Sequence, residues 1–162
     1  IEETREARAV RVAPWMEAAH SSLRTLAEHA AESGVTLGIE TRLNYHEIPL
    51  PHEATELLAP YRHEIAGYLH DVGHAEVQHR LGLTDRSAWW DEVGERLVGL
   101  HLHDVRGLVD HRAPGNGDVD FAWLAARVAA ANPTASRTFE IDQHEPDEDV
   151  TRGLQLLTDL GL

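Results

Sequence analysis

Residues 97–104 read LVGLHLHD, a short apolar run that ends in two histidines and an aspartate. Short apolar runs of this kind are typical of strands that are buried in a parallel sheet. Three other runs have the same form, at residues 35–40, 65–70 and 137–141. Because helical segments separate the four runs, the sequence predicts an α/β fold with a parallel sheet built from right-handed βαβ crossovers.

Helix signals fill the segments around these runs. Leucine and alanine recur at helical spacing up to Gly34, which stands where a helix C-terminal glycine belongs. Ser87 and Asp120 are expected to cap two later helices, because their side chains can accept a backbone N–H. The helices after the first are expected at residues 52–58, 74–81, 87–96, 121–131 and 147–160, with loops at 42–51 and 106–118.

Each predicted strand ends in a side chain that could bind a metal ion. These side chains are Glu40, Asp71, His101 with His103, and Glu140. The C-terminal ends of parallel strands lie along one edge of the sheet, so we expect the side chains to meet there. Buried carboxylates without partners are costly, and a cation between them would relieve their repulsion. Oxygen and imidazole ligands suit Mn²⁺, Mg²⁺, Co²⁺ or Zn²⁺. The alternative is that each group pairs separately with an arginine or a helix N-terminus.

The composition excludes several other kinds of site. The 162 residues contain no cysteine, which rules out disulfides, thiol nucleophiles and cysteine-ligated metals. The net charge is −14, so phosphate backbones and acidic membranes would repel the chain. No apolar run approaches the roughly 18–20 residues of a membrane span, and the first residues lack the pattern of a signal peptide. We therefore expect a cytoplasmic protein that binds neither nucleic acid nor membrane.

Five stretches together resemble a known family. They are GVTLGIE at 34–40, DVGHA at 71–75, HLHD at 101–104, PGNGDVDF at 114–121 and FE at 139–140. In this order they resemble the xylose isomerase-like TIM-barrel superfamily, which contains sugar phosphate isomerases and epimerases, inosose dehydratases and endonuclease IV-type apurinic endonucleases. The resemblance implies a (β/α)8 barrel, of which this chain would hold about four C-terminal βα units.

The resemblance also implies roles for single residues. Glu40, Asp71, His101 and Glu140 match the divalent-metal ligands of the family, and His101 matches the histidine of its H-x-x-D pattern. In the epimerases two ligand glutamates also act as acid and base, a role that falls on Glu40 and Glu140. His74, three residues after Asp71, matches a histidine that contacts substrate or a second metal.

Three further residues are expected to contact substrate. His103 points toward the site if the third strand alternates, and it is also the second choice as a metal ligand. His111 and Arg112 lie where ketose epimerases of the family place an arginine. They could bind a hydroxyl, carboxylate or phosphate group of a sugar-like substrate.

The function implied is that of a divalent-metal-dependent isomerase or epimerase of a small sugar, sugar phosphate or inosose. A metal that bridges a substrate hydroxyl and carbonyl acidifies the neighbouring C–H and stabilises an enediolate. One carboxylate removes the proton and another returns it. The first alternative is endonuclease IV-like cleavage of abasic DNA, but the net charge and the position of Asp110, one residue away from the family's Asp-x-His acid, argue against it. The second alternative is a non-catalytic half-barrel that serves as an assembly module.

Residues 1–162 are expected to form one domain, equal to half a barrel. A complete barrel has eight βα units and about 250 residues, and this sequence supplies four predicted strands. Four strands would leave sheet edges and barrel-interior side chains uncovered. We expect a fragment whose N-terminal half-barrel is missing, because the chain begins within a predicted helix and without Met. A second copy that completes the barrel and a stand-alone half-barrel are the alternatives.

Overall fold

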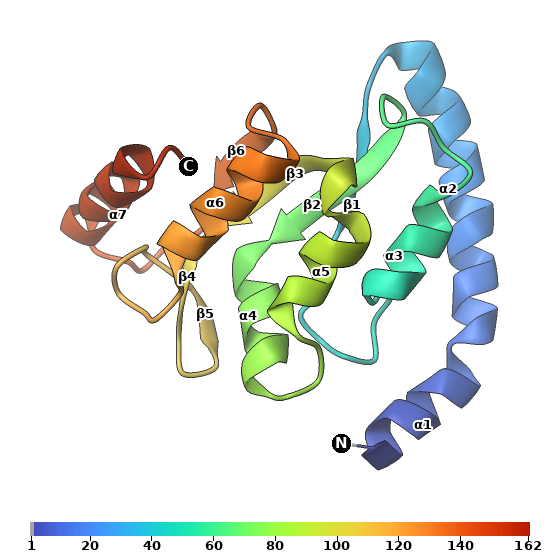
Figure 1. Ribbon diagram of the computed structural model, residues 1–162, viewed down its shortest axis with the longest axis horizontal. Helices are drawn as coiled ribbons and strands as arrows, with labels where there is room; N and C mark the ends of the chain where they lie inside the picture. The colour runs from blue at the N-terminus through green and yellow to red at the C-terminus, as the bar shows by residue number, and fades with distance from the viewer. Residues whose placement is uncertain (1) are drawn as a thin grey trace.

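The structure is a computed structural model that describes residues 2–162, and its architecture is α/β (Figure 1). The elements in chain order are α1 Glu2–Arg11, α2 Ala13–Ser33, β1 Leu37–Glu40, α3 Pro51–Leu58, β2 Ala66–Asp71, α4 Val72–Arg80, α5 Arg86–Val93, the 3-10 turn η1 Gly94–Arg96, β3 Leu97–Leu102, β4 Asp104–Arg106, β5 Val109–Arg112, α6 Phe121–Ala131, β6 Ser136–Phe139 and α7 Asp147–Asp159. None of the helices within residues 2–162 is both long and apolar enough to cross a membrane.

Four parallel strands form the main sheet in the order β1-β2-β3-β6. This confirms the predicted fold class, because consecutive parallel strands are neighbours in the sheet and helices connect them. The register shifts between Tyr68 and Leu69, and this shift places Asp71 opposite His101. Within residues 2–162, β1 and β6 each pair on one side only.

One face of the sheet carries the hydrophobic core. Tyr68, Leu97 and Leu100 are buried there, and α3, α5 and α6 lie on one side of the sheet in Figure 1. The core is densely aromatic, since the Tyr68 and Trp89 rings stack with centroids 5.3 Å apart. The other face is far less covered, and Thr138 is exposed on it.

Helix ends follow the sequence signals in two of three cases. Gly34 ends α2 with φ +66°, and the Asp120 carboxylate accepts a hydrogen bond from the N–H of Trp123 at the start of α6. The expectation that Ser87 caps α5 was wrong. The helix begins at Arg86, and the Asp85 carboxylate caps it by accepting the Ser87 N–H at 2.8 Å.

The segment expected to be a loop at 106–118 instead contains a β-hairpin. β4 and β5 are antiparallel, with Asp104 opposite Arg112 and Arg106 opposite Val109. Gly107 allows the tight turn between them because its φ is +63°. The hairpin matters for function because it leads the chain back over the C-terminal ends of β2 and β3, where α4 contacts both of its strands.

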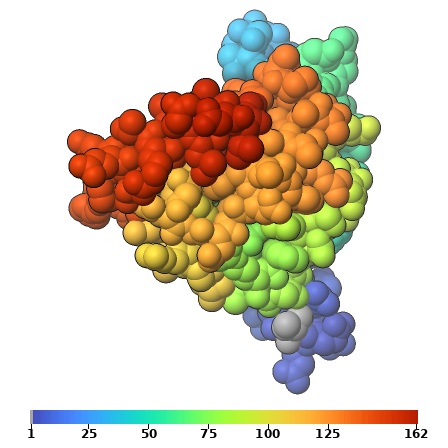
Figure 2. Space-filling model, turned by 60° about the vertical axis from the view of Figure 1, so that its left-hand side comes forward, coloured from blue at the N-terminus to red at the C-terminus, as the bar shows by residue number. Residues whose placement is uncertain are grey.

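A single carboxylate holds the segment that follows the hairpin. Asp104 is buried, and its Oδ1 accepts the N–H groups of Val105 and Val119 at 2.8 and 3.0 Å. Its Oδ2 accepts those of Gly115 and Gly117, both at 2.9 Å. Beyond this segment α7 closes the chain, and Figure 2 shows α7 lying against the hairpin region and α6.

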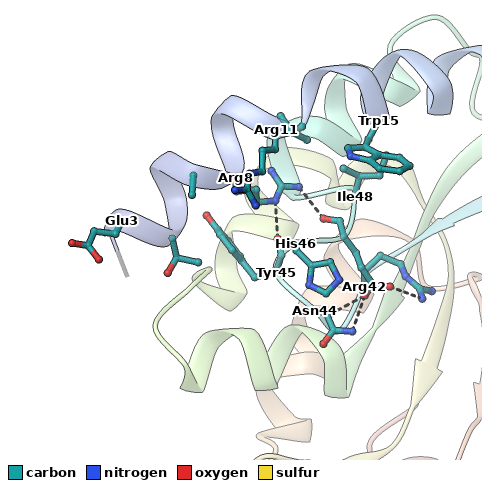
Figure 3. Close-up of a pocket in the computed structure, with 13 residues that line it drawn as sticks. Glu3, Arg8, Arg11, Trp15, Arg42, Asn44, Tyr45, His46 and Ile48 are labelled. Atoms are coloured by element: carbon teal, nitrogen blue, oxygen red, sulfur yellow. Dashed lines mark hydrogen bonds and ion pairs between the residues drawn. The ribbon is translucent and has the colours of Figure 1, made fainter.

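On the β1 side of the sheet, α1 is fixed to the loop that follows β1. The Arg8 guanidinium donates to the carbonyl oxygens of Tyr45 and Glu47 at 2.7 and 2.8 Å, and it also pairs with Glu53. A groove of about 960 Å³ runs between α1 and this loop. Figure 3 shows Trp15 on the helix side of the groove.

Candidate metal centre

Four side chains converge at the C-terminal edge of the sheet. Glu40 ends β1, Asp71 ends β2, His101 lies near the end of β3, and Glu140 directly follows β6. The Nδ1 atom of His101 is their common centre. It lies 3.4 Å from Glu40 Oε1, 3.4 Å from Asp71 Oδ2 and 2.6 Å from Glu140 Oε2.

Three atoms of this cluster are buried and have no hydrogen-bond partner among the described residues. They are Asp71 Oδ2, His101 Nδ1 and Glu140 Oε2. Although His101 Nδ1 and Glu140 Oε2 are close, their orientation does not make a hydrogen bond. Polar atoms that are buried without partners are rare and costly, and here they face one another. Three carboxylates and one imidazole in this arrangement form a donor set that fits a divalent cation.

Asp71 is held in its ionised form. Its side chain is fully buried, which by itself raises the pKa of the carboxyl group. Hydrogen bonds from His103 Nε2 at 2.9 Å and the His74 N–H at 2.8 Å lower the pKa below its usual value. Both of these hydrogen bonds end on Oδ1, so the negative charge of Oδ2 is directed at the cluster.

A second group of potential ligands lies beside the first. Atoms of His74, Asp110 and His111 all lie within 4.8 Å of one another, as do atoms of Glu40, Asp71 and His101. His74 Nδ1 donates to the Thr41 carbonyl oxygen at 2.9 Å, so Nε2 is the ring nitrogen that remains for another partner. That Nε2 atom lies 3.7 Å from Asp110 Oδ2, a buried oxygen for which the described part of the chain offers no hydrogen-bond partner.

The comparisons identify the family of this fold. The sequence model of the xylose isomerase-like TIM barrel matches residues 7–160. The chain belongs to that family. A comparison with curated proteins finds no match.

Two solved structures are similar to this barrel-family chain. A D-tagatose 3-epimerase-like protein superposes with a TM-score of 0.71 at 18% identity, over 87% of this chain and 52% of its own. A 3-keto-D-glucoside 4-epimerase from E. coli superposes with a TM-score of 0.61 at 21% identity, over 86% of this chain and 52% of its own. The chain therefore spans about half the length of these structures.

His103, which was expected to contact substrate, lies below the surface of the site. Its side chain is fully buried, and its ring nitrogens bond to Asp71 Oδ1 and to the N–H of His111. The ring therefore lies beneath the open part of the site, and direct contact with a substrate stays a prediction. As a ligand, His103 is also less well placed than His101, because neither of its nitrogens is unpartnered.

The remaining expected contacts lie in or near the cluster. The side chains of His74 and His111 are 11% and 32% exposed, and His111 Nε2 is 3.8 Å from Glu140 Oε1. Arg112 pairs with a residue outside the cluster: its guanidinium lies 2.8 Å from the buried carboxylate of Glu145. This ion pair fixes the end of β5 and occupies part of the group that was expected to bind substrate.

Sequence reasoning missed two residues of the site. The resemblance places Asp110 one residue away from the family's Asp-x-His acid, yet the hairpin turns Asp110 toward His74. Arg42 was not singled out, yet it donates to Glu40 Oε2 at 3.1 Å and to Glu47 Oε1 at 3.3 Å. Arg42 also lines the groove of Figure 3, so it lies between that groove and the metal-ligand cluster. The position of Arg42, two residues after the strand-end Glu40, could have indicated this role from the sequence.

Proposed function

We propose that this chain carries the divalent-metal centre and the acid–base pair of an isomerase or epimerase of a small sugar, sugar phosphate or inosose. The observation that carries the proposal is the convergence of three carboxylates on His101 Nδ1, with three buried atoms that find no hydrogen-bond partner within residues 2–162. The likeness to two sugar-epimerase structures supports it at the level of the fold.

Glu40, Asp71, His101 and Glu140 would hold the ion, which we expect to be Mn²⁺, Mg²⁺, Co²⁺ or Zn²⁺. When bound, it supplies the positive charge that makes a C–H beside a substrate carbonyl acidic. Asp71 is too deeply buried to reach a substrate, so its part is to bind the ion. Glu40 and Glu140 are partly exposed, with side chains 28% and 42% accessible, so both can meet a substrate as well.

Glu40 and Glu140 are the proposed acid–base pair. One would remove a proton from the carbon next to the carbonyl and the other would return it, through an enediolate. Return to the opposite face of the same carbon gives an epimer, and return to the adjacent carbon gives an aldose–ketose isomer. His74 and His111 border the same space and are proposed to bind substrate hydroxyls, and Arg112 is proposed to bind an anionic group through the donors that Glu145 leaves open.

A second candidate function rests on the neighbouring group of His74, Asp110 and His111. Two or more metal ions side by side are typical of phosphodiester cleavage, as in the endonuclease IV branch of the resemblance. The net charge of −14 opposes binding of a DNA backbone, and we therefore rank this function second. Metal stoichiometry separates the two, since one ion per chain favours the isomerase and two or more favour the nuclease.

The proposed partner is whatever completes the barrel: four further strands of the same protein, or a second copy of this chain. The support for it is that β1 and β6 have one open side each within residues 2–162, and that the similar structures are about twice as long. Substrate-facing loops of the other half would then complete the site.

Metal titration by calorimetry tests the metal centre. We expect the chain to bind MnCl2, and we expect Asp71→Asn to weaken binding at least tenfold. Asp91→Asn, at an exposed position on α5, is the matched control and should bind as the wild type does. Failure of the wild type to bind any of Mn²⁺, Mg²⁺, Co²⁺ and Zn²⁺ would overturn the proposal.

Proton exchange tests the chemistry. The metal-loaded chain is incubated in D2O with fructose, tagatose and their phosphates, and deuterium at the carbon beside the carbonyl is followed by NMR. We expect incorporation with the wild type and its loss with Glu140→Gln. Metal binding without exchange would instead favour the non-catalytic assembly module.

A further inference from the structure

His103 is clamped between the candidate metal centre and the hairpin. Its Nδ1 accepts the backbone N–H of His111 at 2.8 Å, so this nitrogen carries no proton. The proton of the neutral ring is therefore on Nε2, and Nε2 donates it to Asp71 Oδ1 at 2.9 Å. The backbone N–H of His111 in β5 thus sets the tautomer of His103. This tautomer places the N–H donor on Nε2, which faces Asp71.

These contacts decide which oxygen of Asp71 is available. Oδ1 already accepts two hydrogen bonds, from His103 and from the His74 N–H. Oδ2 accepts none from the residues that the structure describes, and it faces His101 Nδ1 at 3.4 Å. We propose that His103 is a positioning residue that presents Asp71 Oδ2 to the metal and couples this ligand to the β4–β5 hairpin. The inference rests on the proposed metal centre.

The His103 ring is packed tightly on two sides. A Cβ atom added to Gly73 would collide with Cε1 and Nδ1 of His103, so the glycine is needed for the ring to lie against α4. On its other side the His111 ring stacks on it, with centroids 4.2 Å apart and planes 11° apart. His111 itself has φ +54°, a backbone conformation that L residues rarely adopt. This unusual backbone is the one that directs its N–H at His103.

Three variants test the role. His103→Leu keeps the bulk of the side chain but removes both hydrogen bonds. His103→Gln keeps one donor and one acceptor and should restore the contact with Asp71. Gly73→Ala leaves both residues intact but displaces the ring, and alanine favours the helical conformation of α4 over glycine. Loss of a partner that orients a metal ligand typically weakens metal binding 10–100-fold.

The measurement is MnCl2 affinity by calorimetry, with the Co²⁺ absorption spectrum as a reporter of ligand geometry. Circular dichroism in EDTA checks that each variant folds. We expect a 10–100-fold loss of Mn²⁺ affinity and an altered Co²⁺ spectrum for His103→Leu and Gly73→Ala, and recovery to within about threefold for His103→Gln. Should His103→Leu not fold, Gly73→Ala and His103→Gln still carry the test.

The outcomes separate this inference from the proposed function. A wild type that binds no metal overturns both. A wild type that binds metal, with variants of equal affinity and spectrum, overturns only the role of His103. Weaker binding that His103→Gln does not restore also overturns it, because ring packing rather than the hydrogen bond to Asp71 would then be responsible. Hydrogen exchange reads out the coupling, and we expect the His111 amide to lose protection in His103→Leu but not in His103→Gln.

Discussion

Arg8 of α1 and Glu53 of α3 form a two-point ion pair, with N–O distances of 2.5 and 2.6 Å and side chains only 8% and 4% exposed. Glu53 also accepts the Leu50 N–H at 2.7 Å and so caps α3. One carboxylate therefore fixes both the start of α3 and the position of α1. The loop between β1 and α3 is held between them.

Glu53→Gln should destabilise the fold in a pH-dependent way. Burial raises the pKa of Glu53, but hydrogen bonds from Arg8 and Leu50 lower it below the usual 4.5. A depressed carboxyl pKa contributes stability that is present above the unfolded-state value and is lost as pH falls through the folded-state value. We expect the variant to lose about 3–5 kcal/mol at pH 7. Urea unfolding from pH 7 to pH 3 measures this, and a deficit that did not shrink below pH 4.5 would contradict the assignment.

Asp104→Asn should loosen the segment after the hairpin. The carboxylate accepts four N–H groups, two on each oxygen. The amide nitrogen of asparagine cannot accept, so two of these N–H groups lose their partner, at a cost of about 0.5–1.5 kcal/mol each because three of the four are only partly buried. Urea unfolding gives the total, and hydrogen exchange at Gly115 and Gly117 locates it. Asp118→Asn, at a side chain 71% exposed, should stay within about 0.5 kcal/mol of the wild type.

His70 should make the fold sensitive to mild acid. Its ring is buried and bonds to the Tyr68 hydroxyl at 2.5 Å, and burial lowers the pKa of His70 from 6.5 to about 4. Because the folded state binds this proton less readily than the unfolded chain, stability falls as pH drops from 6.5 toward 4, by up to about 3 kcal/mol.

The variant His70→Gln should flatten this part of the stability profile, measured by urea unfolding at pH 7, 5.5 and 4.5. His29→Gln, at a side chain 73% exposed, serves as the control and should keep the wild-type profile. Equal slopes for His70→Gln and the wild type would show that another group is responsible.

The strand-end residues could be foreseen because their placement depends on the backbone. In a parallel sheet every strand delivers its last side chains to the same edge, so Glu40, Asp71, His101 and Glu140 are brought together whatever the details of packing. The apolar runs that identify the strands are also the runs that pair. The architecture and the position of the site can therefore both be predicted from short stretches of sequence.

The hairpin could not be foreseen, because its strands lack an apolar alternation. Residues 104–112 read DVRGLVDHR, which is as polar as a loop, and only Gly107 marks the turn. The burial of His103 was missed for the same reason. The alternation of side chains along β3 correctly places His103 on the same face as Asp71. The β4–β5 hairpin then covers His103, and the hydrophobic pattern did not predict that hairpin.

The outer edges of β1 and β6, which pair with no strand in the described part of the chain, bear on how the chain behaves in solution. An unpaired edge offers backbone donors and acceptors to any other edge, whatever its sequence. The net charge of −14 keeps copies of this chain apart at low ionic strength. Salt shortens the reach of that repulsion from about 10 Å at 0.1 M to about 3 Å at 1 M. We therefore expect added salt to favour contact between the strand edges of separate copies of this chain.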